Sequence, residues 1–175
     1  MSKVKDLLLK FARESYLLKA EMDIIATISP TPYETIDRII NDIEDRIFPG
    51  ITICDFGMGD GRWLFSFAKK HNCICFGLEI EEERLLRAKQ LYEMNNNMRG
   101  IVEFVHTNFL TASMVMNNLD IIIIYLSRKG NDAVAPKIQE CKVGAIIIAI
   151  GFKLKDLVYQ KRYDTMPPAY IYTIS

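Results

Sequence analysis

A short glycine-rich turn is the part of this chain best suited to hold a ligand. The heptapeptide Asp55-Phe56-Gly57-Met58-Gly59-Asp60-Gly61 follows a β-rich run and opens a helical pattern. Glycines let the backbone turn tightly and approach a ligand, toward which the free N–H groups of the helix start point. The spacing is G-x-G-x-G, and the carboxylate of Asp55 would repel a pyrophosphate. The turn therefore favours a ligand with a cationic end, such as a nucleoside that carries an amino acid and a sulfonium.

A second carboxylate stands at the end of the next strand pattern, in Gly77-Leu78-Glu79-Ile80. An acidic side chain at this point of an α/β fold can accept both hydroxyls of a ribose. Taken alone, Glu79 could equally be a surface carboxylate near a helix start. Together with the glycine turn one strand–helix–strand unit earlier, it indicates a nucleoside site.

A polar–aromatic pair, Asn108-Phe109, follows the third strand pattern. The Asn108 side chain could bond to the adenine amino group, and the Phe109 ring could pack on the face of the base. The alternative is a polar loop residue beside a core phenylalanine, which is the commoner arrangement for such a pair on its own.

Strand and helix patterns alternate along most of the chain and must position these residues. Short apolar runs predict strands, and 3.6-residue periodicity predicts the helices between them. We expect strands at 51–56, 73–80, 101–105, 120–126 and 144–150, and helices at 60–70, 81–95 and 131–141. The last two β-rich runs, 158–162 and 170–174, are too close for a crossover helix and should pair antiparallel. The sequence thus predicts a doubly wound α/β fold: a seven-stranded, mostly parallel sheet with a C-terminal antiparallel hairpin.

The N-terminal part is expected to be helical. Residues 3–20 have a helical apolar stripe, and this helix either docks on the core or forms a lid over a substrate. Thr31-Pro32-Tyr33-Glu34 has the form of a capping box, in which Thr31 and Glu34 would each bond the backbone of the other at a helix start. We therefore divide the chain into an extension, 1–29, and a ligand-binding domain, 30–175.

Composition excludes several classes of protein. Lys plus Arg and Asp plus Glu each number 22, so the formal net charge is zero, which argues against a nucleic-acid-coating protein. Half the residues are hydrophobic, as in a folded globular chain. The four cysteines show no metal-ligand spacing, so we expect buried reduced thiols and no metal. The apolar runs are too short to span a membrane, and without a secretory pattern we expect a cytoplasmic or nuclear protein.

These motifs, taken in order, resemble the class I S-adenosylmethionine-dependent methyltransferases over roughly residues 30–175. The pattern D-x-G-x-G-x-G, then the acid after the second strand, then the polar–aromatic pair carries the likeness. Within that class the chain is most similar to small protein-lysine methyltransferases, of the ATP synthase c-subunit lysine methyltransferase type and the telomeric-silencing histone type. The closer likeness rests on Pro30-Thr31-Pro32, Asp60-Gly61-Arg62, Tyr125-Leu126 and the closing Tyr170-Ile171-Tyr172-Thr173-Ile174.

The resemblance implies a Rossmann-like fold and S-adenosyl-L-methionine as the cofactor. It places the methionine end of the cofactor near residues 31–35 and the glycine turn, the ribose at Glu79, and the adenine at Asn108 and Phe109. The implied cofactor residues are Thr31, Thr35, Asp55, Gly57, Gly59, Glu79, Asn108 and Phe109. The sequence departs from the family at Asn108, where an aspartate is usual, and at Met58, where a smaller residue is usual. It also lacks the membrane segment of many c-subunit enzymes.

The chain has candidate residues for two kinds of methyl acceptor. A protein lysine would need a desolvated aromatic pocket, for which Tyr125, Tyr33 and Phe152 are candidates, the first two as the catalytic residues. The absence of Asn-Pro-Pro-Tyr after strand four argues against a nucleobase amine as the acceptor. The cations that follow strands four and five would instead favour RNA: Arg128, Lys129, Lys153 and Lys155. We expect a protein substrate first and RNA second. The third alternative is a non-catalytic subunit of a heteromeric complex, which would stabilise a partner subunit that is the enzyme.

Overall fold

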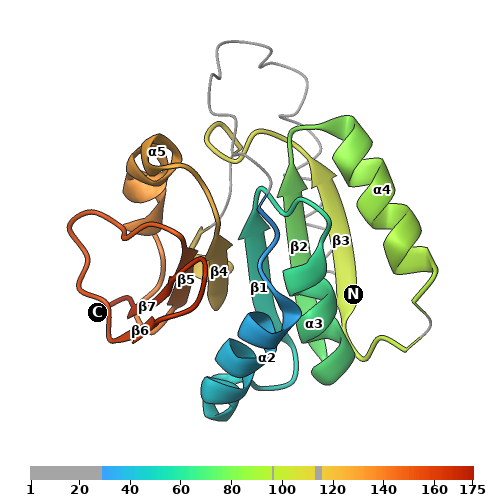
Figure 1. The fold of residues 1–175 in the computed structure, drawn as a ribbon, viewed down its shortest axis with the longest axis horizontal. Helices are drawn as coiled ribbons and strands as arrows, with labels where there is room; N and C mark the ends of the chain where they lie inside the picture. The colour runs from blue at the N-terminus through green and yellow to red at the C-terminus, as the bar shows by residue number, and fades with distance from the viewer. Residues whose placement is uncertain (1–28, 96, 113–115) are drawn as a thin grey trace.

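One mixed sheet forms the centre of the protein in the computed structural model, which describes residues 29–95, 97–112 and 116–175. Across those residues the sheet has seven strands in the order β3-β2-β1-β4-β5-β7-β6 (Figure 1). The strands are β1 Ile51–Phe56, β2 Cys73–Glu79, β3 Ile101–His106, β4 Ile121–Ile124, β5 Ile146–Ile150, β6 Lys161–Tyr163 and β7 Ala169–Thr173. The pairs among β1 to β5 are parallel, whereas β7 runs antiparallel to both β5 and β6. The predicted sheet and its C-terminal hairpin are therefore confirmed.

Helices cover both faces of the sheet, because its central strands are apolar on both sides. The helices are α2 Tyr33–Asp42, α3 Arg62–Lys70, α4 Glu82–Glu93 and α5 Arg128–Ile138, with 3₁₀ turns at Glu44–Arg46 and Met116–Asn118. Alternate residues of β4 enter two separate cores: Ile121 and Ile123 pack with the buried residues of α2, α3 and α4. Ile122 and Ile124 pack with those of α5. The predicted helix 3–20, and most of the predicted extension, lie outside the described residues.

The predicted capping box at the start of α2 is wrong. Pro32 occupies the N-cap position, and no side chain caps the helix. The Thr31 hydroxyl instead accepts a hydrogen bond from Trp63 Nε1 at 3.2 Å. A hydroxyl oxygen can accept only a few hydrogen bonds. The buried indole N–H of Trp63 cannot bond to water, so leaving it without a partner would cost more free energy than leaving a backbone N–H at the helix start uncapped.

Two predicted boundaries shift at the fourth strand. β4 ends at Ile124 rather than at residue 126, and α5 begins at Arg128 rather than at residue 131. Ser127 causes the early start, because its Oγ accepts a hydrogen bond from the backbone N–H of Gly130 at 3.1 Å and so caps the helix. Tyr125 is consequently the first residue after the strand.

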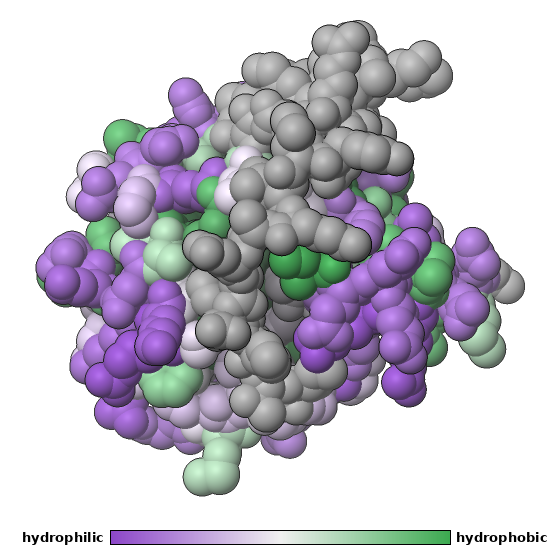
Figure 2. Space-filling model, turned by 90° about the horizontal axis from the view of Figure 1, so that it is seen from above, coloured by the Kyte–Doolittle hydropathy of each residue, from purple (hydrophilic) through white to green (hydrophobic). Residues whose placement is uncertain are grey.

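The carboxyl ends of β1, β2, β4 and β5 share one edge of the sheet, where ligands bind in open α/β folds (Figure 1). Seen from above this edge, the described surface is mostly hydrophilic, with hydrophobic residues in separate spots (Figure 2). In the described part of the chain, no helix has the length and apolar character needed to cross a bilayer.

Candidate functional site

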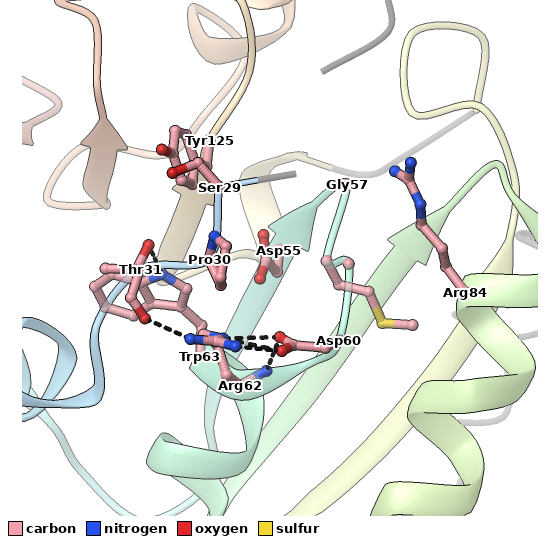
Figure 3. Close-up of a pocket in the computed structure, with 12 residues that line it drawn as sticks. Ser29, Pro30, Thr31, Asp55, Gly57, Asp60, Arg62, Trp63, Arg84 and Tyr125 are labelled. Carbon is pink, nitrogen blue, oxygen red and sulfur yellow. Dashed lines mark hydrogen bonds and ion pairs between the residues drawn. The ribbon is translucent and has the colours of Figure 1, made fainter. Parts of the chain in front are cut away.

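A pocket opens at the carboxyl end of β1, between the glycine turn and the segment that leads into α2 (Figure 3). It brings together five of the residues predicted from the sequence: Thr31, Asp55, Gly57, Gly59 and Tyr125. Seven further residues complete its lining: Ser29, Pro30, Met58, Asp60, Arg62, Trp63 and Arg84. The pocket therefore joins residues from β1, from the loop after β4 and from the segment before α2.

The glycine turn has the backbone geometry that its sequence predicts. Gly57, Gly59 and Gly61 adopt φ angles of +79°, +56° and +77°, a left-handed region that side chains with a Cβ rarely enter. The backbone N–H groups of Gly57 and Met58 both donate to the carbonyl of Leu78, at 2.9 and 3.0 Å. These bonds hold the turn against the end of β2.

Asp55 lines the pocket and is almost fully buried, at 3% exposure. Among the described residues, no side chain or backbone group donates a hydrogen bond to its carboxylate. Burial, together with the negative charges of Glu79 and Asp60, raises the pKa of this carboxyl well above its usual range. A positively charged ligand group would supply a counter-charge to this carboxylate.

Glu79 is also buried, but its carboxylate is already bonded to the backbone. Oε1 accepts from the N–H groups of Ile80 and Glu81 at 2.9 and 3.0 Å, and Oε2 accepts from Gly59 at 3.1 Å. A carboxylate offers about four acceptor positions, so capacity for a hydroxyl donor remains. The predicted contact with a ribose stays a prediction. The bond to the glycine turn is an additional role that its position in the sequence did not indicate.

The predicted adenine residues lie outside the pocket lining. The Oδ1 atom of Asn108 accepts from the backbone N–H of Leu110 at 2.9 Å, so this side chain shapes its own loop. The ring of Phe109 stacks on Phe56 with 5.5 Å between centroids and belongs to the core on the α5 side of the sheet. Their contacts with a base stay predictions.

Thr35 and Tyr33, both in the first turn of α2, also lie outside the lining of the pocket. Thr35 is one of the buried residues of α2. Tyr33 is 55% exposed, and the Arg62 guanidinium lies 5.1 Å from the centre of its ring. The catalytic role predicted for Tyr33 and the cofactor contact predicted for Thr35 stay predictions.

Tyr125 lines the same pocket as Asp55, and its predicted catalytic role stays a prediction. Gly151, just after β5, makes room for its ring: a Cβ at that position would lie 3.3 Å from Tyr125 Cε2. The φ angle of +82° at Gly151 is a second reason for a glycine there.

An ion pair in the pocket was not predicted as part of the site. Arg62 Nε donates to both carboxylate oxygens of Asp60, at 2.9 and 3.0 Å. The guanidinium lowers the pKa of Asp60 against the effect of burial. The signal was present in the Asp60-Gly61-Arg62 motif, which was assigned to the family likeness without a role.

The comparisons with known proteins agree with this geometry. The ANTKMT methyltransferase domain family matches residues 55–161, from the buried aspartate of the glycine turn to the first residue of β6. The chain belongs to this methyltransferase family. The resemblance to small lysine methyltransferases of the ATP synthase c-subunit type is thereby confirmed. A search of the curated proteins finds no match.

Solved structures show the same fold at low sequence identity. An RNA methyltransferase from Salinibacter ruber, in complex with S-adenosyl-L-homocysteine, has a TM-score of 0.71 at 21% identity, covering 83% of this chain and 94% of its own. The putative methyltransferase yhhF from Escherichia coli has a TM-score of 0.65 at 13% identity, with 87% and 91% coverage. A SAM-dependent methyltransferase from Thiobacillus denitrificans, also in complex with S-adenosyl-L-homocysteine, has a TM-score of 0.57 at 17% identity, covering 90% of this chain and 58% of its own.

The cofactor of this methyltransferase is S-adenosyl-L-methionine. The residues of the pocket fit it: the left-handed glycines leave space for close approach, and no cation of the described residues pairs with the buried Asp55 carboxylate. Asp55 and the glycine turn would hold the amino-acid end, and Glu79 the ribose. The cofactor supplies a methyl group that is already activated by its bond to a sulfonium.

Proposed function

We propose that this methyltransferase modifies the side-chain amine of a protein lysine. The proposal rests on one observation, that Tyr125 and Asp55 line the same pocket at the carboxyl ends of β4 and β1. An aromatic side chain next to the cationic end of the cofactor is suited to a long, apolar side chain that ends in an amine. The membership of the ANTKMT family, with its likeness to lysine methyltransferases, supports the same acceptor.

The pocket can assist methyl transfer in two ways. A lysine must lose its ammonium proton before its nitrogen can attack, and an apolar aromatic wall lowers the pKa of the amine by disfavouring the charged form. The side chains of Tyr125 and Trp63 would also hold the acceptor in line with the methyl carbon. Such alignment lowers the barrier by as much as about 7–11 kcal/mol. The N–C bond forms as the C–S bond breaks, leaving S-adenosyl-L-homocysteine.

RNA is the second candidate, and one observation favours it. Four cations stand on exposed positions after β4 and β5: Arg128, Lys129, Lys153 and Lys155. Two of them are engaged with aromatic rings, since Arg128 lies 5.7 Å from the centre of Phe152 and Lys153 lies 4.8 Å from that of Tyr159. Phosphates attract such a rim, and exposed aromatic rings stack on bases.

Labelling with tritiated S-adenosyl-L-methionine tests the proposal. The purified protein is incubated with cell lysate, and the product is divided between ribonuclease and protease digestion. Label that survives ribonuclease and is recovered as methyl-lysine after acid hydrolysis supports the lysine acceptor. Label lost to ribonuclease contradicts it and favours RNA. The Asp55→Asn variant is the control for background transfer, and a lysate that stays unlabelled favours a non-catalytic subunit.

A further inference from the structure

The Arg62 guanidinium makes contacts with two separate segments of the chain. On one side it holds Asp60 of the glycine turn through Nε and through Nη2, the latter at 2.5 Å. On the other side, Nη1 donates to the backbone carbonyl of Thr31 at 2.9 Å. The ring of Tyr33 packs against the guanidinium at 5.1 Å. Arg62 therefore bridges the cofactor turn and the segment before α2.

Trp63 makes a second bond to the same threonine. Its Nε1 donates to the Thr31 hydroxyl at 3.2 Å, and both side chains are buried. Two consecutive residues of α3 thus hold the carbonyl and the hydroxyl of one residue 31 or 32 positions earlier. Thr31 is thus anchored to the first turn of α3 through both its backbone carbonyl and its side-chain hydroxyl.

The anchored segment is a wall of the pocket. Ser29, Pro30 and Thr31 all line it, together with Tyr125 (Figure 3). In this view Asp60 and Arg62 lie below Pro30 and Asp55, with dashed lines from Arg62 to both Asp60 and Thr31. The position of the wall relative to the glycine turn is therefore set by the Asp60–Arg62–Thr31 chain of contacts.

We propose that Arg62 is a positioning residue that locks residues 29–31 to the glycine turn and so fixes the distance between cofactor and methyl acceptor. Arginine suits this role because its planar fork can bind a carboxylate and a carbonyl at once while an aromatic ring packs on its face. Lysine would keep the charge next to Asp60 but could not keep all these contacts. The inference depends on the S-adenosyl-L-methionine site and does not depend on a lysine acceptor.

The protein has one tryptophan, Trp63, so its fluorescence reports on the anchored wall without any acceptor. At 4% exposure this indole should be protected from acrylamide in the wild-type protein. In Arg62→Lys, each hydrogen bond lost should raise the population in which residues 29–31 are detached from α3 about fivefold. Acrylamide quenching of Trp63 fluorescence should increase accordingly. Thr31→Val, which removes only the bond to the indole, should also raise quenching. The double variant should give less than the product of the two effects, because both act on one contact chain.

Arg46 offers a matched control. It too joins distant segments, donating to Thr173 Oγ1 and to the Gly144 carbonyl, both at 2.9 Å, but it lies outside the pocket. Arg46→Lys should leave quenching of Trp63 and binding of S-adenosyl-L-homocysteine unchanged. In the labelling assay with saturating cofactor, Arg62→Lys should lower the initial rate by up to about 100-fold, since an error of about 1 Å in alignment has that effect. Its affinity for S-adenosyl-L-homocysteine should change far less.

The inference is overturned if Arg62→Lys, folded by circular dichroism, is quenched like the wild-type protein. It is also overturned if rate and product affinity fall by the same factor, which would indicate a damaged cofactor site. Equal effects of Arg46→Lys would show a general loss of stability and overturn it as well. If the wild-type protein labels no acceptor, the proposed function fails, while the quenching comparison still decides the role of Arg62.

Discussion

The Oε2 atom of Glu79 accepts a hydrogen bond from the backbone N–H of Gly59 at 3.1 Å. The carboxylate at the end of β2 thus stabilises the glycine turn at the end of β1, in addition to any contact with a ribose. The adjacent pairing of the two parallel strands brings these residues together, with Asp55 opposite Gly77 and Phe56 opposite Leu78. The predicted ribose contact of Glu79 would therefore couple cofactor binding to the shape of the turn.

Replacing Glu79 by alanine should weaken binding of S-adenosyl-L-methionine by about 1.5–3 kcal/mol, the range for a hydrogen bond to a charged group. The variant loses the ribose acceptor and the support of the Gly59 N–H together. Isothermal titration calorimetry measures the affinity, and Glu83→Ala, an exposed carboxylate in the first turn of α4, is the control. An affinity equal to that of the wild-type protein would remove Glu79 from the site.

Asp55→Asn should stabilise the cofactor-free protein at neutral pH. Because the pKa of Asp55 is raised in the folded state, the folded chain binds more protons than the unfolded chain between the two pKa values. Stability from this group is complete at low pH and is lost as the pH rises through the folded pKa. Urea unfolding at several pH values should show this loss in the wild-type protein and in the Asp132→Asn control, but not in Asp55→Asn. If the free energy of unfolding depended on pH in the same way in all three proteins, the role of Asp55 would be contradicted.

Binding of S-adenosyl-L-methionine should release a proton from Asp55. The cationic cofactor favours the ionised carboxylate, so it lowers the pKa that burial has raised. Affinity should therefore increase with pH until the pKa of the cofactor-free state is passed. Calorimetry in buffers of different ionisation enthalpy measures the proton directly. Proton release that persists in Asp55→Asn would assign it to another group.

Tyr125→Phe should lower turnover more than it lowers cofactor affinity, since the proposed function assigns Tyr125 to the methyl acceptor. The measurement is kcat on the labelled acceptor beside the dissociation constant of S-adenosyl-L-homocysteine. Tyr159→Phe is a suitable control, because that ring packs on Tyr170 and Tyr172 and does not line the pocket. Equal losses in both quantities for Tyr125→Phe would argue against an acceptor-side role.

Alanine at Gly59 and at Gly61 should separate binding from stability. Both positions have positive φ, so each substitution carries a backbone strain of about 1–2 kcal/mol. A Cβ at Gly59 would meet nothing within 4 Å, whereas one at Gly61 would lie 2.7 Å from Cζ of the buried Phe65. We expect Gly61→Ala to lose about 1–3 kcal/mol more in thermal unfolding. Gly59→Ala should mainly weaken product binding, because Gly59 lines the pocket and the added methyl group would meet no protein atom. The reverse order in either measurement would contradict this interpretation.

Local patterns in the sequence determined the order and type of most elements, because alternation and 3.6-residue periodicity depend only on which side of a chain segment is buried. The central strand β1 was predicted at its exact bounds. The antiparallel pairing at the end of the sheet was also predicted, although β6 and β7 lie at Lys161–Tyr163 and Ala169–Thr173 rather than at 158–162 and 170–174. The glycine turn could also be predicted from the sequence, since positive φ at Gly57 and Gly59 depends on backbone sterics alone.

Only the tertiary structure decided which partner each polar side chain takes. Thr31 had a local partner available at Glu34, but the fold brought the indole N–H of Trp63 to its hydroxyl and the guanidinium of Arg62 to its carbonyl. The fold likewise brought the ring of Phe109 onto Phe56, a neighbour that the local sequence did not indicate. A hydrogen-bonding or aromatic side chain takes the partner that folding places within a few ångströms, and residues far apart in sequence become such neighbours only when the sheet and helices pack.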